Sequence, residues 1–195
     1  MTSQIKFYEE KLEELKKESN FRYLKDFVQE GKFLILNNSK LLNLSSNDYL
    51  GISIDENIKD NFLSSYKGKL ENPSARLLSG SNKPFFELEN LIQEELKVEA
   101  ALLFNSGYHA NVGIYSALLN RDDVVFIDKL NHASIIDGIH LSGAKLIPFN
   151  HLDYDDLENK LKKYRKQYKN AIISTETLFS MDGDIADIKK LVELK

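Results

Sequence analysis

The chain has 195 residues, of which 42% are hydrophobic and 29% are charged, and its formal net charge is −4. These values are typical of a globular protein with one substantial core and room for a small appendage. The acidic and basic residues are interleaved, which argues against a nucleic-acid partner, and the absence of cysteine excludes disulfides and thiolate metal sites. No apolar run is long enough for a membrane span or a signal peptide, so we expect a cytoplasmic protein with no membrane partner.

Residues 1–45 are predicted to form a separate N-terminal segment. Apolar side chains recur on one helical face within the first 20 residues. Two short apolar runs, 33–36 and 41–44, flank a polar stretch that contains two asparagines, which is typical of a β-hairpin. We therefore expect a helix and a hairpin ahead of the main domain.

Residues 46–195 are predicted to form the first part of a larger α/β domain. It is expected to begin with a helix over 55–66 and a loop over 71–83, which is dense in Gly, Ser, Asn and Pro. Strands and helices then alternate: strands are expected at 100–104, 124–127, 145–149 and 171–175, and helices at 84–96, 108–119, 133–141, 153–168 and from 185 onward. This alternation indicates βαβ units and a mainly parallel sheet. Because the last helix should lead to another strand, we expect the domain to be truncated at residue 195.

The turn after the first of these strands is a candidate anion site. Gly107 and Tyr108 begin the following helix, and the free N–H groups of a helix start suit a phosphate. The same residues also fit an ordinary strand–helix turn.

Two further candidates follow later strands. His132 lies where the strand 124–127 passes into a helix, and the carboxyl ends of parallel strands are where ligands bind in open α/β sheets. A structural histidine is the alternative reading. The segment 176–184 follows the last strand and contains Asp182-Gly183, a turn signal. The three segments are expected to converge on one cleft.

Five motifs carry a resemblance to a known family. They are residues 44–51 (Leu-Ser-Ser-Asn-Asp-Tyr-Leu-Gly), 74–80 (Ser-Ala-Arg-Leu-Leu-Ser-Gly), 104–108 (Phe-Asn-Ser-Gly-Tyr), 128–134 (Asp-Lys-Leu-Asn-His-Ala-Ser) and 176–184 (Glu-Thr-Leu-Phe-Ser-Met-Asp-Gly-Asp). Through them the chain resembles the N-terminal half of an α-oxoamine synthase, one of the pyridoxal-phosphate-dependent enzymes similar to class II aminotransferases. The resemblance implies the α/β fold of the fold-type I transferases, with its mainly parallel sheet.

The resemblance also implies how the cofactor, pyridoxal 5'-phosphate, would be held. His132 would stack on the pyridine ring and act in catalysis. Gly107 and Tyr108 would donate backbone N–H groups to the phosphate. Ser180 would hydrogen-bond the phenolic oxygen of the ring, although a serine there could instead cap a helix. No metal is implied.

For the substrates, the resemblance assigns Asn47 to the surroundings of the reacting groups and Arg22 to the carboxylate of the acyl substrate. Asn47 could also merely cap its loop. Within the family, the motifs are most similar to the biotin-pathway member that makes 8-amino-7-oxononanoate. That member condenses L-alanine with a pimeloyl thioester, pimeloyl-CoA or pimeloyl carrier protein, as an acyltransferase, and a homodimer is expected for the full-length enzyme.

Two alternatives remain open. One is another α-oxoamine synthase, which would use glycine or serine with a different acyl-CoA. The other is a non-catalytic fragment that needs a partner chain. The family's Schiff-base lysine lies in a later segment than those matched here, so the 195-residue chain alone is expected to be inactive.

Overall fold

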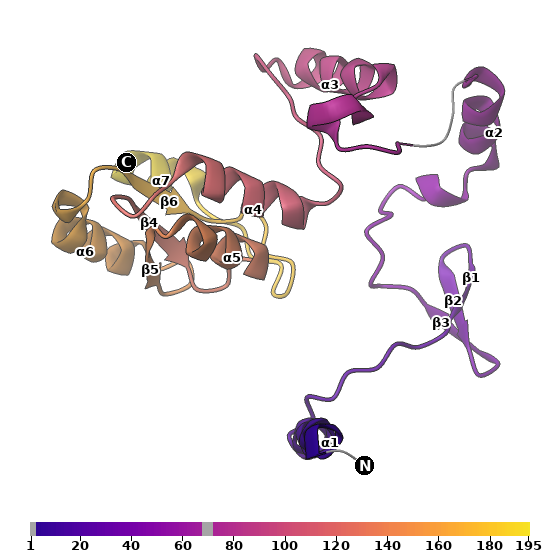
Figure 1. Cartoon of the computed structure of the whole chain (residues 1–195), viewed down its shortest axis with the longest axis horizontal. Coiled ribbons are helices and arrows are strands. Elements are labelled where there is room, and N and C mark those ends of the chain that lie inside the picture. Colours follow the sequence, from indigo (N-terminus) through magenta and orange to yellow (C-terminus); the bar gives the residue numbers. More distant parts are fainter. Residues whose placement is uncertain (1–2, 68–71) are drawn as a thin grey trace. The chain divides into compact units, whose positions relative to one another are not determined.

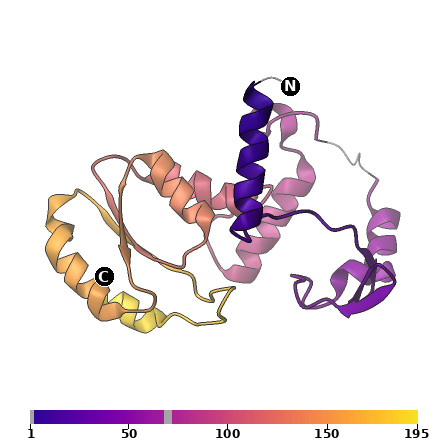
Figure 2. The ribbon, with the colours of Figure 1, turned by 90° about the horizontal axis from the view of Figure 1, so that it is seen from below.

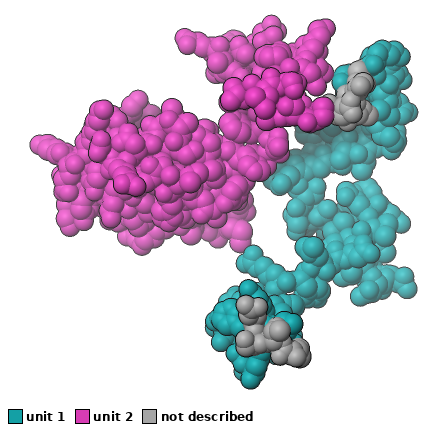
Figure 3. All heavy atoms as spheres, viewed as in Figure 1, with its two compact units in different colours: residues 1–71 teal, residues 72–195 magenta. Residues whose placement is uncertain are grey.

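The computed structural model describes residues 3–67 and 72–195 (Figure 1). Its contacts divide the chain into two compact units, residues 1–71 and 72–195 (Figure 3). The boundary that the sequence places after residue 45 lies inside the first unit and stays a prediction.

The first unit contains two helices and a small antiparallel sheet. In chain order they are α1 (Ser3–Lys17), β1 (Val28–Glu30), β2 (Phe33–Leu36), β3 (Ser39–Leu42), the short 3₁₀ turn η1 (Ile52–Ile54) and α2 (Glu56–Ser65). The predicted hairpin is present, because Asn37 and Asn38 both adopt positive φ angles, 47° and 63°, which match the twist of paired strands. The strand β1, which pairs with β2, has no counterpart among the predicted elements.

The second unit alternates helices and strands. It contains the π-helical turn η2 (Arg76–Gly80), α3 (Lys83–Leu96), α4 (Gly107–Leu118), β4 (Val124–Asp128), α5 (Ala133–Ser142), β5 (Lys145–Phe149), α6 (Tyr154–Tyr164), the 3₁₀ turn η3 (Arg165–Gln167), β6 (Ala171–Ser174) and α7 (Ile188–Leu194). The strands form a parallel sheet in the order β5-β4-β6. The predicted parallel sheet is thus confirmed, with β6 at one of its edges.

The central strand β4 is buried on both faces. Val124 and Phe126 pack into one cluster with α6 and α7, while Val125 and Ile127 pack into another with α4 and α5. Figures 1 and 2 show these helix pairs on opposite faces of the sheet. Because successive side chains of a strand point to opposite faces, an unbroken apolar run is what such a strand requires.

Two expectations about the region before α4 are wrong. The loop predicted over 71–83 contains the helical turn η2; residue 71 of that range is outside the described residues. The predicted strand 100–104 is irregular, because no described segment pairs with it. Its Leu103 instead donates its N–H to the Glu89 carboxylate (2.8 Å) and accepts a hydrogen bond from Arg76 (3.1 Å). Side chains therefore satisfy the backbone groups that a neighbouring strand would otherwise take.

None of the helices in the described part of the chain has the length and apolar character needed to cross a membrane.

Candidate functional site

His132 lies at the carboxyl edge of the sheet, where it caps the start of α5. Its ring Nδ1 accepts a hydrogen bond from the Ser134 N–H (3.2 Å) and lies 2.7 Å from the Ser134 hydroxyl oxygen. Its backbone N–H donates to the carboxylate of Glu176, in the loop after β6. Because Nδ1 is an acceptor, the proton of the neutral ring belongs on Nε2. The exposed ring is therefore oriented by Ser134, and its backbone is held by Glu176 from the loop after β6.

Ser134 connects this histidine to α4. The Asn111 side-chain amide donates to the Ser134 hydroxyl (2.9 Å), and Ser134 itself is fully buried. One turn away, the Tyr108 hydroxyl donates to the Asp137 carboxylate on α5. This hydrogen bond, together with burial and the charge of Asp137, raises the pKa of Tyr108, so the phenol stays protonated. The starts of α4 and α5 are thus held together by two polar contacts.

The first turn of α4 offers free hydrogen-bond donors. Ser106 caps the helix by accepting from the His109 N–H (3.2 Å), and its carbonyl accepts from Ala110 (3.0 Å). Within the described residues, the N–H groups of Gly107 and Tyr108 have no hydrogen-bond partner. A Cβ atom at Gly107 would meet nothing within 4 Å, so the space beside this backbone is open. Such a helix start fits an anion.

A second polar contact set lies beneath this edge, at the end of β6. The buried Ser174 hydroxyl lies 2.7 Å from the Tyr115 hydroxyl and accepts from the Asn131 side chain (3.1 Å). The Asn131 carbonyl oxygen is buried and has no partner among the described residues. The loop that carries His132 is therefore hydrogen-bonded to Ser174 of β6, and Ser174 in turn contacts Tyr115 of α4.

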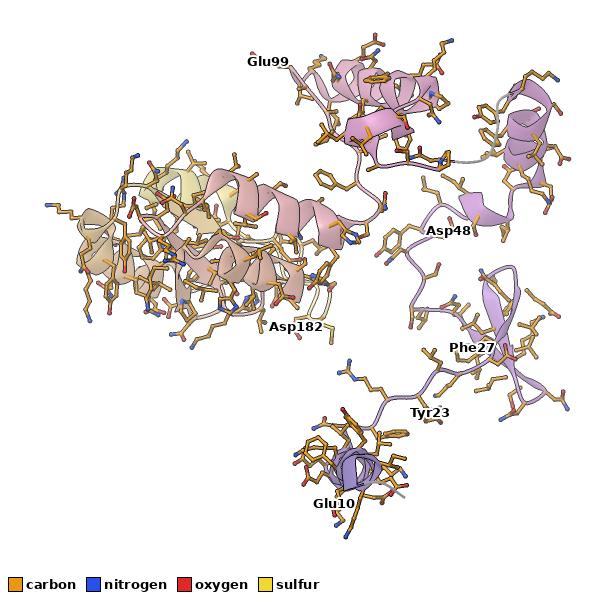
Figure 4. All side chains as sticks on the ribbon, viewed as in Figure 1. Glu10, Tyr23, Phe27, Asp48, Glu99 and Asp182 are labelled. Atoms are coloured by element: carbon orange, nitrogen blue, oxygen red, sulfur yellow. The ribbon has the colours of Figure 1, made fainter. Side chains whose placement is uncertain are left out.

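The structure brings together some of the predicted site residues. Tyr108 and His132 both connect to α5 through the contacts above, and Gly107 precedes Tyr108. Ser180 is exposed in the turn between β6 and α7, and Asp182, two residues later, lies at the tip of that turn (Figure 4). No hydrogen bond joins Ser180 to His132 in the residues that the structure describes. The role of Ser180 stays a prediction.

Asn47 and Arg22 belong to the first unit, and both side chains are exposed. Asp48, not Asn47, closes the loop before η1: its carboxylate accepts from the Ile52 N–H (2.8 Å) and from the Ser53 hydroxyl (2.6 Å; Figure 4). Likewise Asp187, not Ser180, caps α7. The capping roles considered for Asn47 and Ser180 are therefore wrong, and their functional roles stay predictions.

Sequence reasoning missed several residues of this edge. Ser134 and Glu176 lie inside quoted motifs without an assigned role, and only their contacts with His132 show what they do. His151 was missed completely, although it follows β5 at the same carboxyl edge. Its ring lies between the carboxylates of Asp128 (2.9 Å) and Asp184 (3.2 Å). Its place directly after the predicted strand 145–149 is the signal that could have pointed to it.

Comparison with known sequences gives one family. The profile of the family "Aminotransferase class I and II" matches residues 39–195. A Haemophilus influenzae protein named "Putative 8-amino-7-oxononanoate synthase" is 44% identical over 191 residues, which are 96% of this chain and 50% of that protein. A Neisseria meningitidis protein of the same name is 43% identical, over 98% of this chain and 51% of its own length. The chain thus spans about half the length of the curated relatives it matches.

Solved structures with the same fold agree. A serine palmitoyltransferase from S. paucimobilis with a bound PLP–myriocin aldimine matches 98% of this chain and 49% of its own, with a TM-score of 0.81 and 24% identity. An 8-amino-7-oxononanoate synthase from Francisella tularensis matches 77% of this chain and 41% of its own, with a TM-score of 0.60 and 30% identity. The first likeness concerns the fold alone, and the predicted fold-type I architecture is confirmed. The chain belongs to the aminotransferase class I and II family, and the resemblance of its motifs to the α-oxoamine synthases is confirmed.

Proposed function

We propose that the chain contributes the cofactor-binding first part of an acyltransferase that makes 8-amino-7-oxononanoate for biotin biosynthesis. In this reaction, a carbon–carbon bond forms between the α-carbon of L-alanine and the thioester carbonyl of a pimeloyl group. The carbon–sulfur bond breaks and releases CoA or carrier protein, and the alanine carboxylate leaves as CO₂. The enzyme is proposed to be a cytoplasmic homodimer, as the family resemblance implies.

The observation that carries this proposal is the exposed His132 ring, fixed at a strand end and connected through Ser134 and Asn111 to the helix whose first N–H groups are free. A flat aromatic ring can stack on a side-chain ring, and a phosphate can accept from the unpaired N–H donors of a helix start. The described residues supply both, so they fit pyridoxal 5'-phosphate.

Each residue of this edge has a proposed task. The N–H groups of Gly107 and Tyr108 would bind the phosphate, and His132 would contact the ring face and keep water from it. Ser180 would donate a hydrogen bond to the phenolic oxygen of the ring. When bound, pyridoxal phosphate supplies the electron sink that makes the α-proton of the amino acid removable. The protein's contribution is orientation and tuning of these groups.

The contacts of His132 favour one protonation pattern. Since the Ser134 N–H occupies Nδ1, the neutral imidazole presents its Nε2–H outward. An N–H at that position can donate to a substrate carboxylate beside the ring, which would orient the amino acid.

Asn47 and Arg22 would complete the substrate contacts, with Arg22 binding the far carboxylate of the pimeloyl chain through its guanidinium.

The choice of substrates rests on the relatives. Identity of 43–44% to proteins named "Putative 8-amino-7-oxononanoate synthase" supports L-alanine and a pimeloyl thioester. The serine palmitoyltransferase match, at 24% identity, supports the fold and no particular amino acid.

The test is an assay of the protein encoded by the whole gene, purified with pyridoxal phosphate. L-Alanine with pimeloyl-CoA is compared with glycine or serine and acetyl-, succinyl- or palmitoyl-CoA, and product, CoA and CO₂ are quantified by mass spectrometry and coupled assays. We expect equal release of the three products with the alanine pair, and turnover at least about tenfold lower with every other pair, a discrimination typical of pockets that differ by small groups. Preference for glycine or serine would assign another member of the family. No turnover, with a stop codon directly after codon 195, would favour the non-catalytic fragment.

A further inference from the structure

His151 lies in the loop after β5, with a carboxylate on each side of its ring. Its Nδ1 is 2.9 Å from the Asp128 carboxylate at the end of β4, and its Nε2 is 3.2 Å from the Asp184 carboxylate in the loop before α7. The ring also meets the Phe179 ring edge to face, with centroids 4.5 Å apart. The side chain of His151 is 21% exposed, that of Asp128 is completely buried, and that of Asp184 is 49% exposed.

Asp128 organises two loops at once. One carboxylate oxygen accepts from the Leu130 N–H (2.9 Å), which begins the loop that ends in His132. The other accepts from the Leu152 N–H (2.9 Å), which follows His151. A buried carboxylate requires such partners, and the imidazole of His151 completes the set.

Asp184 and Phe179 close a small hairpin. Phe179 donates its N–H to the Asp184 carbonyl (2.9 Å), and Gly183 donates to the Phe179 carbonyl (2.9 Å) with a φ of +77°, which favours glycine. A bridge between Leu178 and Ile185 pairs the two ends. We refer to residues 178–185 as the turn hairpin. Ser180 lies within it, directly after the buried ring of Phe179.

His151 therefore connects the turn hairpin to the sheet through side-chain contacts. It contacts the turn hairpin at the Asp184 carboxylate and at the Phe179 ring, and it contacts β4 at Asp128. On the basis of the function proposed above, we propose that His151 is a positioning residue: it holds the turn hairpin, and with it Ser180, in register with the loop that carries His132.

The charge of His151 strengthens this connection. The hydrogen bond to Asp128 raises the pKa of His151, burial lowers it, and the hydrogen bond to Asp184 raises it further, with a net increase. These two carboxylates are the charged groups that face the ring; Asp153, two residues later, instead caps α6. Because the pKa is raised in the folded protein, the stabilisation is present below about pH 6.5, the ordinary histidine value, and is lost as the pH rises through the raised value.

The experiment uses the full-length protein, with amide hydrogen exchange as a readout that does not depend on the cofactor. His151→Gln removes the titrating ring, and Asp184→Asn weakens only the half-exposed contact, so it reports on the turn hairpin even if the first variant fails to fold. The matched control is His140→Gln, since His140 is exposed on α5 and its ring makes no hydrogen bond to a described residue.

We expect peptides of the turn hairpin to exchange about tenfold faster in His151→Gln and Asp184→Asn, the effect of losing a charge-assisted hydrogen bond, with no change in His140→Gln. After correction for intrinsic rates, exchange in the wild-type protein should increase from pH 6 to pH 9 and should be flat in His151→Gln. The Kd for pyridoxal phosphate should rise several-fold in both variants. Another neutral side chain in place of His151 should restore neither the exchange rates of the turn hairpin nor the Kd for pyridoxal phosphate.

Unchanged exchange in both variants would overturn the proposal, and so would faster exchange with an unchanged Kd for the cofactor. If the wild-type protein does not bind pyridoxal phosphate, the proposed function fails, and the exchange rates alone then decide whether His151 positions the turn hairpin.

Discussion

Arg76 and Glu89 form a bidentate ion pair that binds the Leu103 backbone in place of a neighbouring strand. The two terminal nitrogens of Arg76 reach the two carboxylate oxygens of Glu89 at 2.7 and 3.1 Å. The guanidinium lies 4.5 Å from the ring centre of Phe85, and both charged side chains bind the backbone of Leu103. The pair thus fixes η2, α3 and the irregular segment before α4 to one another.

Glu89→Gln should therefore lower the Tm by several degrees, because it leaves the Arg76 charge without its partner. The matched control is Glu87→Gln on the same helix, which removes an exposed pair with Lys83 and should change the Tm little.

The hydrogen bond from Arg76, followed by that from the Leu103 N–H, lowers the pKa of Glu89. The stabilisation is thus present above about pH 4.5 and lost as the pH falls through the lowered value, so thermal melts of variant and wild type should converge in acid. Equal Tm losses in both variants would contradict this role.

His132→Ala should weaken cofactor binding and turnover while leaving the fold intact. The ring is exposed, so its removal takes away a stacking surface and the cap of α5 but no core volume. We expect a Kd for pyridoxal phosphate about tenfold higher, a weaker cofactor absorbance band and a Tm within a few degrees of wild type. His140→Ala, on the same helix, is the control. Normal cofactor spectra together with a large loss of stability would identify a structural histidine.

Ser134→Ala should destabilise the protein by about 1–3 kcal/mol, because it leaves the Asn111 side-chain amide without its partner and removes the hydroxyl beside the His132 Nδ1, which keeps only the Ser134 N–H. Ser116→Ala removes an exposed hydroxyl that bonds only its own helix, and should cost less than about 0.5 kcal/mol. Urea unfolding measures both values. Equal stability of the two variants would show that the contacts of Ser134 do not hold α4 to α5.

The 195-residue chain on its own should associate in solution. Among the described residues β6 pairs only with β4, and its other edge borders a groove of about 610 Å³ whose apolar lining includes Leu161, Ile188 and Val192. Unpaired strand edges beside apolar surface promote association. Size-exclusion chromatography and thermal melting of the chain test this. A monodisperse monomer with one sharp transition would contradict it.

Much of the fold follows from local patterns. The two asparagines at Asn37 and Asn38 require a tight turn, and they form one. The helix predicted over 55–66 is present as α2, and Asp55 caps it by accepting from the Asn57 N–H. The position of His132 between an apolar run and a helix predicts that it follows a strand, and in the structure it lies between β4 and α5. These features depend on residues that are neighbours in the chain.

By itself, the sequence determined the alternation of strands and helices, the mainly parallel sheet, and the residues at the ends of its strands. Only the tertiary structure decided which of these residues meet. The apolar run 100–104 predicts a strand, yet a strand needs a partner, and Leu103 binds Arg76 and Glu89 instead. In the same way His151 meets Asp184, which follows it by 33 positions. Periodicity reports which face of an element is buried, whereas a hydrogen bond between distant residues depends on how the whole chain folds back on itself.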